Sequence, residues 1–317
     1  MILPKSMILQ IAIILAILAL LPYTVSMPFA FDIIVFGLSA IAYNIMLGYV
    51  GYLSFGHAAF FGIGVYGTGL ALRYLTIPRP FAWISILIGL ALALVAGTSI
   101  GAVAVKRGGA YFALTTMAFG ETLHFTLLQF KEITGGDDGL LGIPRPFLGN
   151  SEPTIPQLYY ISLTVFAAAF IFLRLLTKSH FGKLLLAVRD NEERLKFLGY
   201  NPYRIKLAAF IISTFFTALA GSFYVIYLRY AGLGMVSWVM SGDIVFMSIL
   251  GGTGTFHGPL LGTVLYTVIR DYVNRYTRNW PLIMGVALIV IMVGARRGIL
   301  DYIVGKLEKR WGRRIDV

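Results

Sequence analysis

The sequence is built from long apolar runs of the length that crosses a lipid bilayer. A transmembrane helix needs roughly 20 mostly apolar residues. Of the 317 residues, 58% are hydrophobic and 13% are charged, whereas soluble chains carry about 25% charged residues. The chain is therefore expected to be an all-α integral membrane protein, a polytopic bundle of about ten transmembrane helices. The expected spans are 7–22, 31–48, 57–75, 82–104, 110–130, 157–176, 207–228, 241–254, 257–272 and 281–295.

A single transmembrane domain, 1–317, is expected, because the loops between the runs are too short for a core of their own. The largest are 131–156 and 177–206. The first run resembles a signal peptide, but Pro22 ends it and no small-residue cleavage site follows. We expect it to be a retained first helix.

Basic residues predict the orientation, because Lys and Arg gather in cytoplasmic loops. The stretch 174–206 holds eight of them and the tail from Arg296 to Arg314 holds seven. The loop 131–156 has four acidic residues against two basic ones and is expected to be external. With ten spans, both termini lie in the cytoplasm. The same rule explains the net charge of +12 without invoking nucleic acid.

Two glycine-rich elements, near 48–57 and 251–259, interrupt apolar runs. LGYVG at 47–51 is followed by a glycine that opens another run, and LGGTG at 250–254 is followed in the same way. Broken helices at corresponding places in two halves mark the substrate path of many transporters, although small residues also serve helix packing. The candidate path residues are Gly48, Gly51, Gly56, His57, Gly251, Gly252, Gly254, Gly258 and Pro259.

His57 and Pro259 each suggest a specific role within these elements. A histidine inside a membrane either forms interhelical hydrogen bonds that hold the break or contacts the substrate. Pro259 suits the first turn of a helix, where its missing N–H costs nothing. Gly251 to Gly258 is therefore expected to be a break or tight turn before a helix.

The loop 177–206 predicts one short amphipathic helix, from Gly182 to Leu198, with apolar residues at helical spacing. Gly199 occupies the position that a helix C-cap prefers, and Asn201-Pro202 predicts a turn before the next span. The helix either lies in the membrane interface or docks on a soluble partner. Its mixed charges favour a protein partner, since helices that bind anionic lipid are basic.

Enzyme chemistry finds little support in the sequence. The four histidines lack metal-site spacing, and neither a P-loop nor a GxSxG elbow is present. Glu121 and Asp243 are the main intramembrane carboxylates. The turn-rich segment TGGDDGLLGIPRP lacks the spacing of a calcium loop and is expected to be a shaped external turn.

The chain resembles the permease subunits of ABC importers for branched-chain amino acids. The resemblance runs from about Tyr43 to Leu265. It lies in five segments: YNIMLGYVGYLSFGHAAFFGIGVY, GAYFALTTMAFGETLH, TGGDDGLLGIPRP, FGKLLLAVRDNEERLKFLGYNPYRIKLAAFIISTFFTALAGSFY and SILGGTGTFHGPLLG. His124, where the family often has a basic residue, and SWVMSGDIVF depart from the pattern and leave the substrate open.

The resemblance implies a multi-subunit assembly in a prokaryotic inner (plasma) membrane. A homologous second permease, two cytoplasmic ABC ATPases and an extracytoplasmic substrate-binding protein would be its partners. ATP and Mg would bind the ATPases, and this chain would bind no cofactor. Ala187 to Gly199 would form the coupling helix that receives the ATPase movement. The expected coupling residues are Arg189, Asp190, Asn191, Glu192, Glu193 and Gly199.

Three alternatives to this function remain open at the level of sequence. An ABC permease for urea or short-chain amides shares much of the pattern. A secondary transporter or a channel would need no ATP, although the sparse carboxylates offer no obvious proton relay. An intramembrane enzyme would need Glu121, His57 or Asp243 for turnover.

Overall fold

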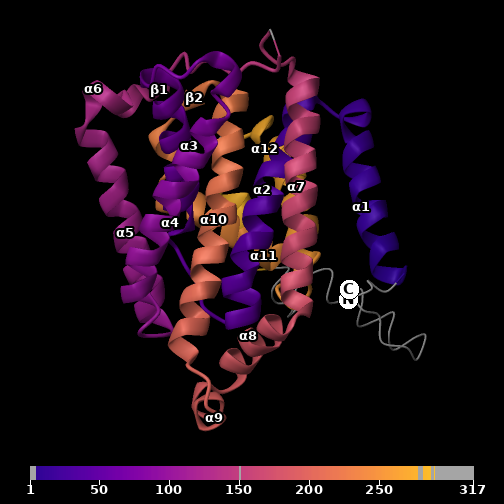
Figure 1. Ribbon diagram of the computed structural model, residues 1–317. Helices are drawn as coiled ribbons and strands as arrows, with labels where there is room; N and C mark the ends of the chain where they lie inside the picture. Colours follow the sequence, from indigo (N-terminus) through magenta and orange to yellow (C-terminus); the bar gives the residue numbers. More distant parts are fainter. Residues whose placement is uncertain (1–4, 150, 278–280, 287–288, 290–317) are drawn as a thin grey trace.

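The computed structural model describes residues 5–149, 151–277, 281–286 and 289, and it is a bundle of helices (Figure 1). Residues 281–286 are helical, and the rest of the expected span 281–295 lies largely outside the described residues. The longer helices are α1 (Lys5–Thr24), α2 (Met27–Asn44), α3 (His57–Tyr74), α4 (Ile84–Ala104), α5 (Ala110–Gln129), α7 (Ile155–Lys178), α10 (Pro202–Leu228), α11 (Trp238–Gly251) and α12 (Gly258–Asn274).

Short elements occupy the two ends of the bundle. At one end, β1 (Leu140–Leu141) pairs antiparallel with β2 (Tyr230–Ala231), and α6 (Lys131–Thr134) lies nearby. At the other end are α8 (His180–Asp190) and α9 (Glu192–Phe197) (Figure 1). The remaining short elements are the π-helix η1 (Ile45–Val50) and the 3-10 turns η2 (Arg79–Phe81), η3 (Gly136–Asp138) and η4 (Leu233–Met235).

The centre of the bundle is formed by α10, which packs against α2, α3 and α4. Close approach of α3 and α10 depends on glycine, because a Cβ at Gly64 would overlap the carbonyl of Ala218 and one at Gly221 would overlap that of Phe61. In α2 and η1, 89% of the most apolar window is buried inside the chain. Helices α2, α3 and α10 therefore form the framework on which the functional elements are placed.

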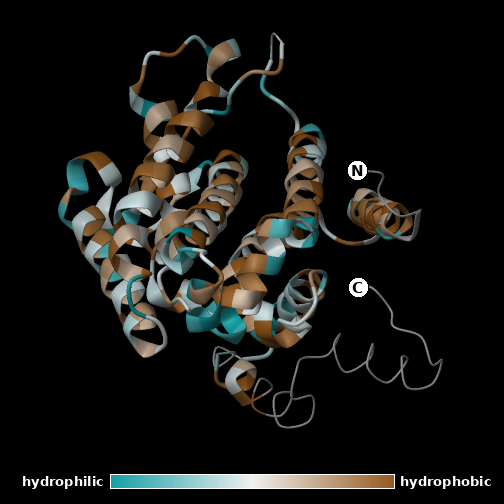
Figure 2. Cartoon of the chain, turned by 60° about the horizontal axis from the view of Figure 1, so that its bottom comes forward, coloured by the Kyte–Doolittle hydropathy of each residue, from teal (hydrophilic) through white to brown (hydrophobic). Residues whose placement is uncertain are grey.

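The first helix lies at the edge and packs only on α2 and α7 among the principal contacts. Only 17% of its apolar window is buried, and its ribbon, beside the N label of Figure 2, is hydrophobic nearly all round. An exposed helix of this composition suits contact with lipid tails.

Five described helices are long and apolar enough to cross a membrane. Helices also occupy the expected positions 57–75, 110–130, 241–254 and 257–272, as α3, α5, α11 and α12. The all-α membrane architecture is thus confirmed. The number of ten crossings is not, because five described helices meet the criteria of length and composition. The five segments are Met7–Thr24, Met27–Val50, Ile84–Ala104, Ile155–Lys178 and Pro202–Leu228.

The segment 131–149 folds as a shaped turn tied to α10. Arg145 donates through Nε to the carbonyl of Ile226 at 3.1 Å and through Nη2 to that of Tyr227 at 2.8 Å. Asp137 and Asp138 lie in η3, and no group of three potential metal ligands occurs among the described residues. The expectation of a shaped turn agrees with this arrangement.

Candidate functional site: two glycine elements and the loop 177–206

The first glycine element turns the chain back into the bundle. After α2 the helix widens into η1, Gly51 adopts a left-handed conformation with φ +84°, and residues 51–56 are not helical before α3 begins at His57. Ser54 and His57 are fully buried. Irregular backbone at membrane depth is tolerated only where protein or a wet cavity surrounds it; here protein surrounds the part from Ser54 to His57, and Gly51 and Tyr52 line a cavity.

His57 holds this segment through a closed hydrogen-bond network. Ser213 donates to the carbonyl of Ala42 at 2.7 Å, so its oxygen accepts from His57 Nε2 at 2.8 Å. Ser54 then donates to His57 Nδ1 at 2.8 Å and accepts from the Gly56 N–H at 3.3 Å. The neutral Nε2–H tautomer therefore gives every hydroxyl hydrogen an acceptor.

Two further hydrogen bonds hold the non-helical segment 51–56 and the start of α3 in place within the bundle. Tyr43 accepts from the Ser54 N–H at 3.1 Å, and Ser241 accepts from the Ala58 N–H at 3.0 Å. Ser213 lies about 16 Å along α10 from Pro202, in a helix about 40 Å long. His57 is thus near the middle of the bundle. Its two nitrogens are occupied by serines, so of its two expected roles the structure favours holding the break.

At Gly48 and Gly56 of the first element, neighbouring groups leave no room for a side chain. A Cβ at Gly48 would overlap Asn44 Oδ1 and the carbonyl of Thr253, and one at Gly56 would overlap the carbonyl of Thr116. These glycines allow other segments to approach the backbone directly.

The second element is a tight hairpin between α11 and α12. A Cβ at Gly251 would overlap the carbonyl of Gly258, and one at Gly258 would overlap that of Gly252. Gly252 has φ +113°, and Gly254 lies in the connecting segment 252–257. Pro259 stands in the first turn of α12, as predicted. The glycines of this element mainly serve close backbone packing.

The two elements meet in space. Asn44 Nδ2 donates to the carbonyl of Thr255 at 3.2 Å, and Gly48 faces the carbonyl of Thr253. Segments about two hundred residues apart in sequence therefore form one contiguous site near the α8–α9 end.

The loop 177–206 contains two helices, so the prediction of one helix over 182–198 is wrong. The helix breaks at Asn191, which is extended with φ −166° and caps α9 by accepting from the Arg194 N–H at 2.9 Å. The expected coupling helix from Ala187 to Gly199 spans this break. Gly199 ends α9 with φ +85°, as predicted, and the Tyr200 N–H bonds the carbonyl of Leu195 at 3.2 Å.

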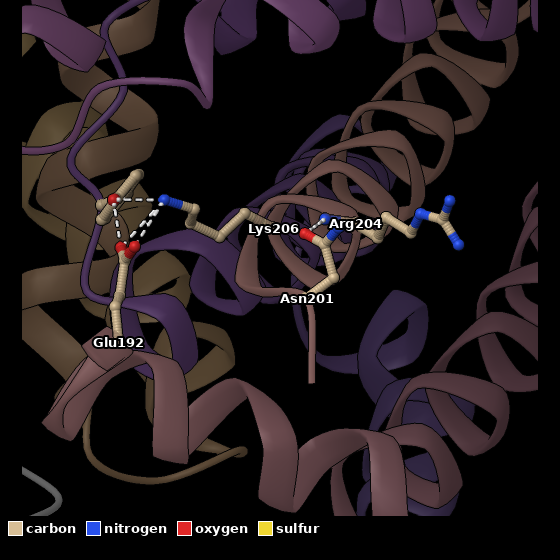
Figure 3. Close-up of polar contacts among 5 residues, drawn as sticks. Glu192, Asn201, Arg204 and Lys206 are labelled. Atoms are coloured by element: carbon tan, nitrogen blue, oxygen red, sulfur yellow. Dashed lines mark hydrogen bonds and ion pairs between the residues drawn. The ribbon is translucent and has the colours of Figure 1, made fainter. Parts of the chain in front are cut away.

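Two residues of this loop reach into the first glycine element. Arg189 Nη1 donates to the carbonyl of Gly48. Glu192 accepts from Lys206 Nζ at 2.9 Å, as Figure 3 shows, and from the hydroxyl of Tyr52 at 2.7 Å. Lys206 is almost fully buried, so this pair ties α9 to α10 and to the segment after Gly51.

The charge of Glu192 is maintained by these contacts. Desolvation disfavours ionisation of its carboxyl, but the hydrogen bonds from Lys206 and Tyr52 outweigh that effect and lower its pKa below the ordinary value. Arg189 is exposed and Glu192 is half-buried, and both bond to the bundle, while their expected contact with a partner stays a prediction. Asp190 and Glu193 are exposed.

An apolar tip on α9 was missed by the sequence reasoning. Phe197 is 91% exposed and Leu198 is 68% exposed, and α9 projects furthest at that end of the bundle (Figure 1). The sequence signal for their exposure was their position just before Gly199. Apolar residues at the end of a short helix outside the bundle have no core to pack into.

The candidate catalytic groups have separate partners. Glu121 accepts from the Trp238 N–H at 3.2 Å, Asp243 accepts from the hydroxyl of Tyr266 at 2.6 Å, and His57 bonds serines. The serines that bond His57 are, like His57 itself, fully buried, and the hydroxyl of Ser213 already donates to the carbonyl of Ala42.

Comparison with known proteins identifies the family. The family model described as the branched-chain amino acid transport system, permease component, matches residues 26–293. The high-affinity branched-chain amino acid transport system permease protein LivM of Escherichia coli (strain K12) is 26% identical over 293 residues, which cover 85% of this chain and 68% of that protein. The probable LivM protein of Methanocaldococcus jannaschii is 24% identical over 281 residues, covering 78% and 81%.

A more distant similarity links the chain to the autoinducer 2 import system permease protein LsrC of Photorhabdus laumondii, 29% identical over 195 residues that cover 59% of this chain and 56% of that protein. No solved structure shows a significant match. The family model covers most of the chain, from the start of α2 to beyond α12, and so includes both glycine elements and the loop 177–206. The chain therefore belongs to the family of permease components of branched-chain amino acid transport systems.

Proposed function

We propose that this chain forms half of the translocation pathway of an ATP-driven importer for leucine, isoleucine and valine. The observation that carries the proposal is the pair of contacts from Arg189 and Glu192 to the first glycine element, within a chain of this family. These contacts connect the loop 177–206 to Gly48 in the π-helix η1 and to Tyr52 in the non-helical segment 51–56. A permease needs such a connection if an external motor drives it.

The assembly contains a homologous second permease, two cytoplasmic ABC ATPases and an extracytoplasmic substrate-binding protein. ATP and Mg bind the ATPases, and this chain carries no cofactor. The loop 177–206 and both termini face the cytoplasm of a prokaryotic cell, the loop 131–156 faces outward, and the chain lies in the inner (plasma) membrane. The positive charge of 174–206 supports this orientation.

The ATPase contacts the outward side of α8 and α9. Asp190 and Glu193 provide exposed charge, and Phe197 and Leu198 provide the apolar anchor. Buried aromatic anchors dominate many protein interfaces. The inward side, with Arg189 and Glu192, transmits the movement to Gly48 and Tyr52.

Translocation follows from movement of the first glycine element. Residues 51–56 lack helical hydrogen bonds and are held mainly by side chains around His57. Displacement of Gly48 by Arg189 changes the contact with Thr253 in the second element. The path therefore runs beside Gly48, Gly51, Gly56, Gly251, Gly252, Gly254 and Gly258.

The direct test is uptake of labelled leucine by energised cells with and without this chain, with unlabelled isoleucine, valine, urea or acetamide as competitor. The expected result is loss of leucine uptake on deletion and competition by isoleucine and valine only. Unchanged leucine uptake together with lost urea or amide uptake would replace the substrate. Leucine flux without ATP in vesicles holding the purified assembly would replace the mechanism with that of a secondary transporter or channel.

The docking face is tested by replacing Phe197 with serine in the assembled complex. We expect the ATPases to dissociate during purification while the permease stays folded. Leu148→Ser, at an apolar residue 47% exposed at the other end of the bundle, is the matched control. Retention of the ATPases by the Phe197→Ser complex would exclude this anchor.

A further inference from the structure

A cavity of about 330 Å³ lies between α2, α10, α11, α12 and η4, away from both glycine elements. Its size falls within the range of about 300–1,000 Å³ that is common for small-molecule sites. Among its lining residues are one carboxylate, Asp243, and one guanidinium, Arg270. Ionisable residues within membrane helices are rare and usually functional.

The two charged groups each retain bonding capacity. Tyr266 donates to Asp243 Oδ1 at 2.6 Å, and Oδ2 accepts no hydrogen bond within the described part of the chain. Arg270 donates through Nη2 to Asp32 at 2.7 Å and through Nε to Asp271 at 3.3 Å, and Nη1 has no partner among the described residues. The cavity therefore borders a free acceptor and a free donor of opposite charge.

The rest of the wall is largely apolar. Phe36, Met240, Ile244 and Met247 line it, and methionine adapts its shape to different aliphatic groups. Gly234 also lines it, and a Cβ there would meet nothing within 4 Å. Gly234 is exposed and therefore has room for a side chain beside the cavity.

The cavity lies toward the β1–β2 end of the bundle. Asp32 is near the start of α2, and Arg270 is near the end of α12. Phe31 stacks on Tyr227, close to β2, with ring centroids 3.9 Å apart. In the proposed orientation this is the external end, where substrate arrives.

We propose that this cavity is a receiving site for the zwitterion of an aliphatic α-amino acid. Asp243 binds the ammonium group, Arg270 binds the carboxylate while Asp32 fixes its guanidinium, and the apolar wall takes the side chain. The inference rests on the proposed function and deepens it. It predicts that an uncharged amide such as urea, which has neither an ammonium group nor a carboxylate, does not bind in this cavity.

Labelling tests the site without relying on transport. The chain contains no cysteine, so Gly234→Cys creates a single thiol beside the cavity. In the assembled membrane complex without its substrate-binding protein, leucine should slow maleimide alkylation several-fold. Urea, 4-methylpentanoate and isopentylamine, which each lack one or both charged groups, should not. Ser151→Cys, in the exposed loop before α7, should show no protection.

The charged anchor is tested by Asp243→Asn in the Gly234→Cys background, with Asp271→Asn as the matched control. Asp271 is also bonded to Arg270 but does not line this cavity. Protection by leucine should disappear with Asp243→Asn and persist with Asp271→Asn. In the chain without added cysteine, Asp243→Asn should raise the KM for leucine several-fold more than Asp271→Asn.

Normal leucine uptake without protection at position 234, or equal KM values for the two asparagine variants, would overturn the site and leave the proposed function standing. If the unmodified complex does not transport leucine selectively, the proposed function itself is rejected. Equal protection by leucine and by isopentylamine would remove the role of Arg270 and overturn recognition of the zwitterion.

Discussion

The two glycine elements share a sequence pattern but differ in what holds them. Residues 51–56 are fixed by side-chain hydrogen bonds around His57, and the loop residues Arg189 and Glu192 contact the same region. The α11–α12 hairpin is held by direct backbone contact between Gly251 and Gly258. Similar glycine spacing thus produces a segment held by replaceable polar contacts in one place and a packed corner in the other. The first is suited to movement and the second to support.

The largest expected effect is on the packed corner. Gly258→Ala places a methyl group against the carbonyl of Gly252, where neither backbone can give way. We expect most of the folded protein to be lost, as measured by fluorescence-detected size exclusion of the complex. Gly285→Ala, at a helical glycine with open space around it, should leave the yield unchanged. Normal yield of Gly258→Ala would show that the hairpin is not rigid.

A smaller but clear loss is expected at His57. His57→Ala removes one hydrogen-bond partner from each of two buried serines and creates a cavity, which should cost about 3 kcal/mol of unfolding free energy. His257→Ala in the second element should cost roughly 1–2 kcal/mol, because its contact is ring stacking on Phe170. Thermal unfolding of both purified variants gives the comparison. An equal loss at the two histidines would contradict the distinction between the elements.

The contact of Glu192 with Lys206 and Tyr52 allows coupling to be tested separately from stability. Glu192→Gln removes the charge opposite buried Lys206 and should cost about 2 kcal/mol. Uptake should fall while the ATPases remain bound. Glu193→Gln, at the exposed neighbouring position, should transport normally. If Glu193→Gln impairs uptake as strongly, the contact to Tyr52 and Lys206 is not the route of coupling.

The same carboxylate sets a pH dependence. Because the pKa of Glu192 in the folded chain lies below its ordinary value, its stabilisation is present above the pKa of the unfolded state. It is lost as the pH falls through the folded-state pKa. The difference in unfolding temperature between the unmodified chain and Glu192→Gln should be constant from neutral to weakly acidic pH. It should shrink only in stronger acid.

The smallest expected effect compares two left-handed glycines. Gly51 has φ +84° and Gly199 has φ +85°, so alanine at either position costs about 1 kcal/mol. A Cβ at Gly51 would also lie 3.0 Å from Arg189 Cγ, whereas one at Gly199 meets nothing within 4 Å. Gly51→Ala should therefore reduce uptake while Gly199→Ala does not, at similar unfolding temperatures. Equal uptake by both would show that Arg189 does not sense this position.

Local features of the fold followed from the sequence because their causes are local. Apolar length predicted nine helical positions, Pro259 predicted the start of α12, and Gly199 predicted the end of α9. The break at Asn191 was missed because apolar residues keep helical spacing across it. Its signal was Asn191 followed by Glu192 and Glu193, a capping residue with an acidic first turn.

Contacts between distant segments could not be predicted from one sequence. Nothing near His57 indicates that Ser213 will meet it, since 156 residues separate them. The charges of Arg189 and Glu192 were visible, but which side of the loop faces the bundle depends on how α8 packs against α7 and η1. The pairing of Asp32 with Arg270 is likewise a product of the folded bundle.

The break at Asn191 has a mechanical consequence. Arg189 lies on one side of it and grips Gly48, while Glu192 lies on the other and grips Tyr52 and Lys206. A force on the tip of α9 is therefore divided between two attachment points joined by the extended residue Asn191. Helices α2 and α3 are regular rods, and the non-helical residues 51–56, after η1, are the link between them. Strain applied at the tip concentrates in that link and leaves the rods nearly unbent.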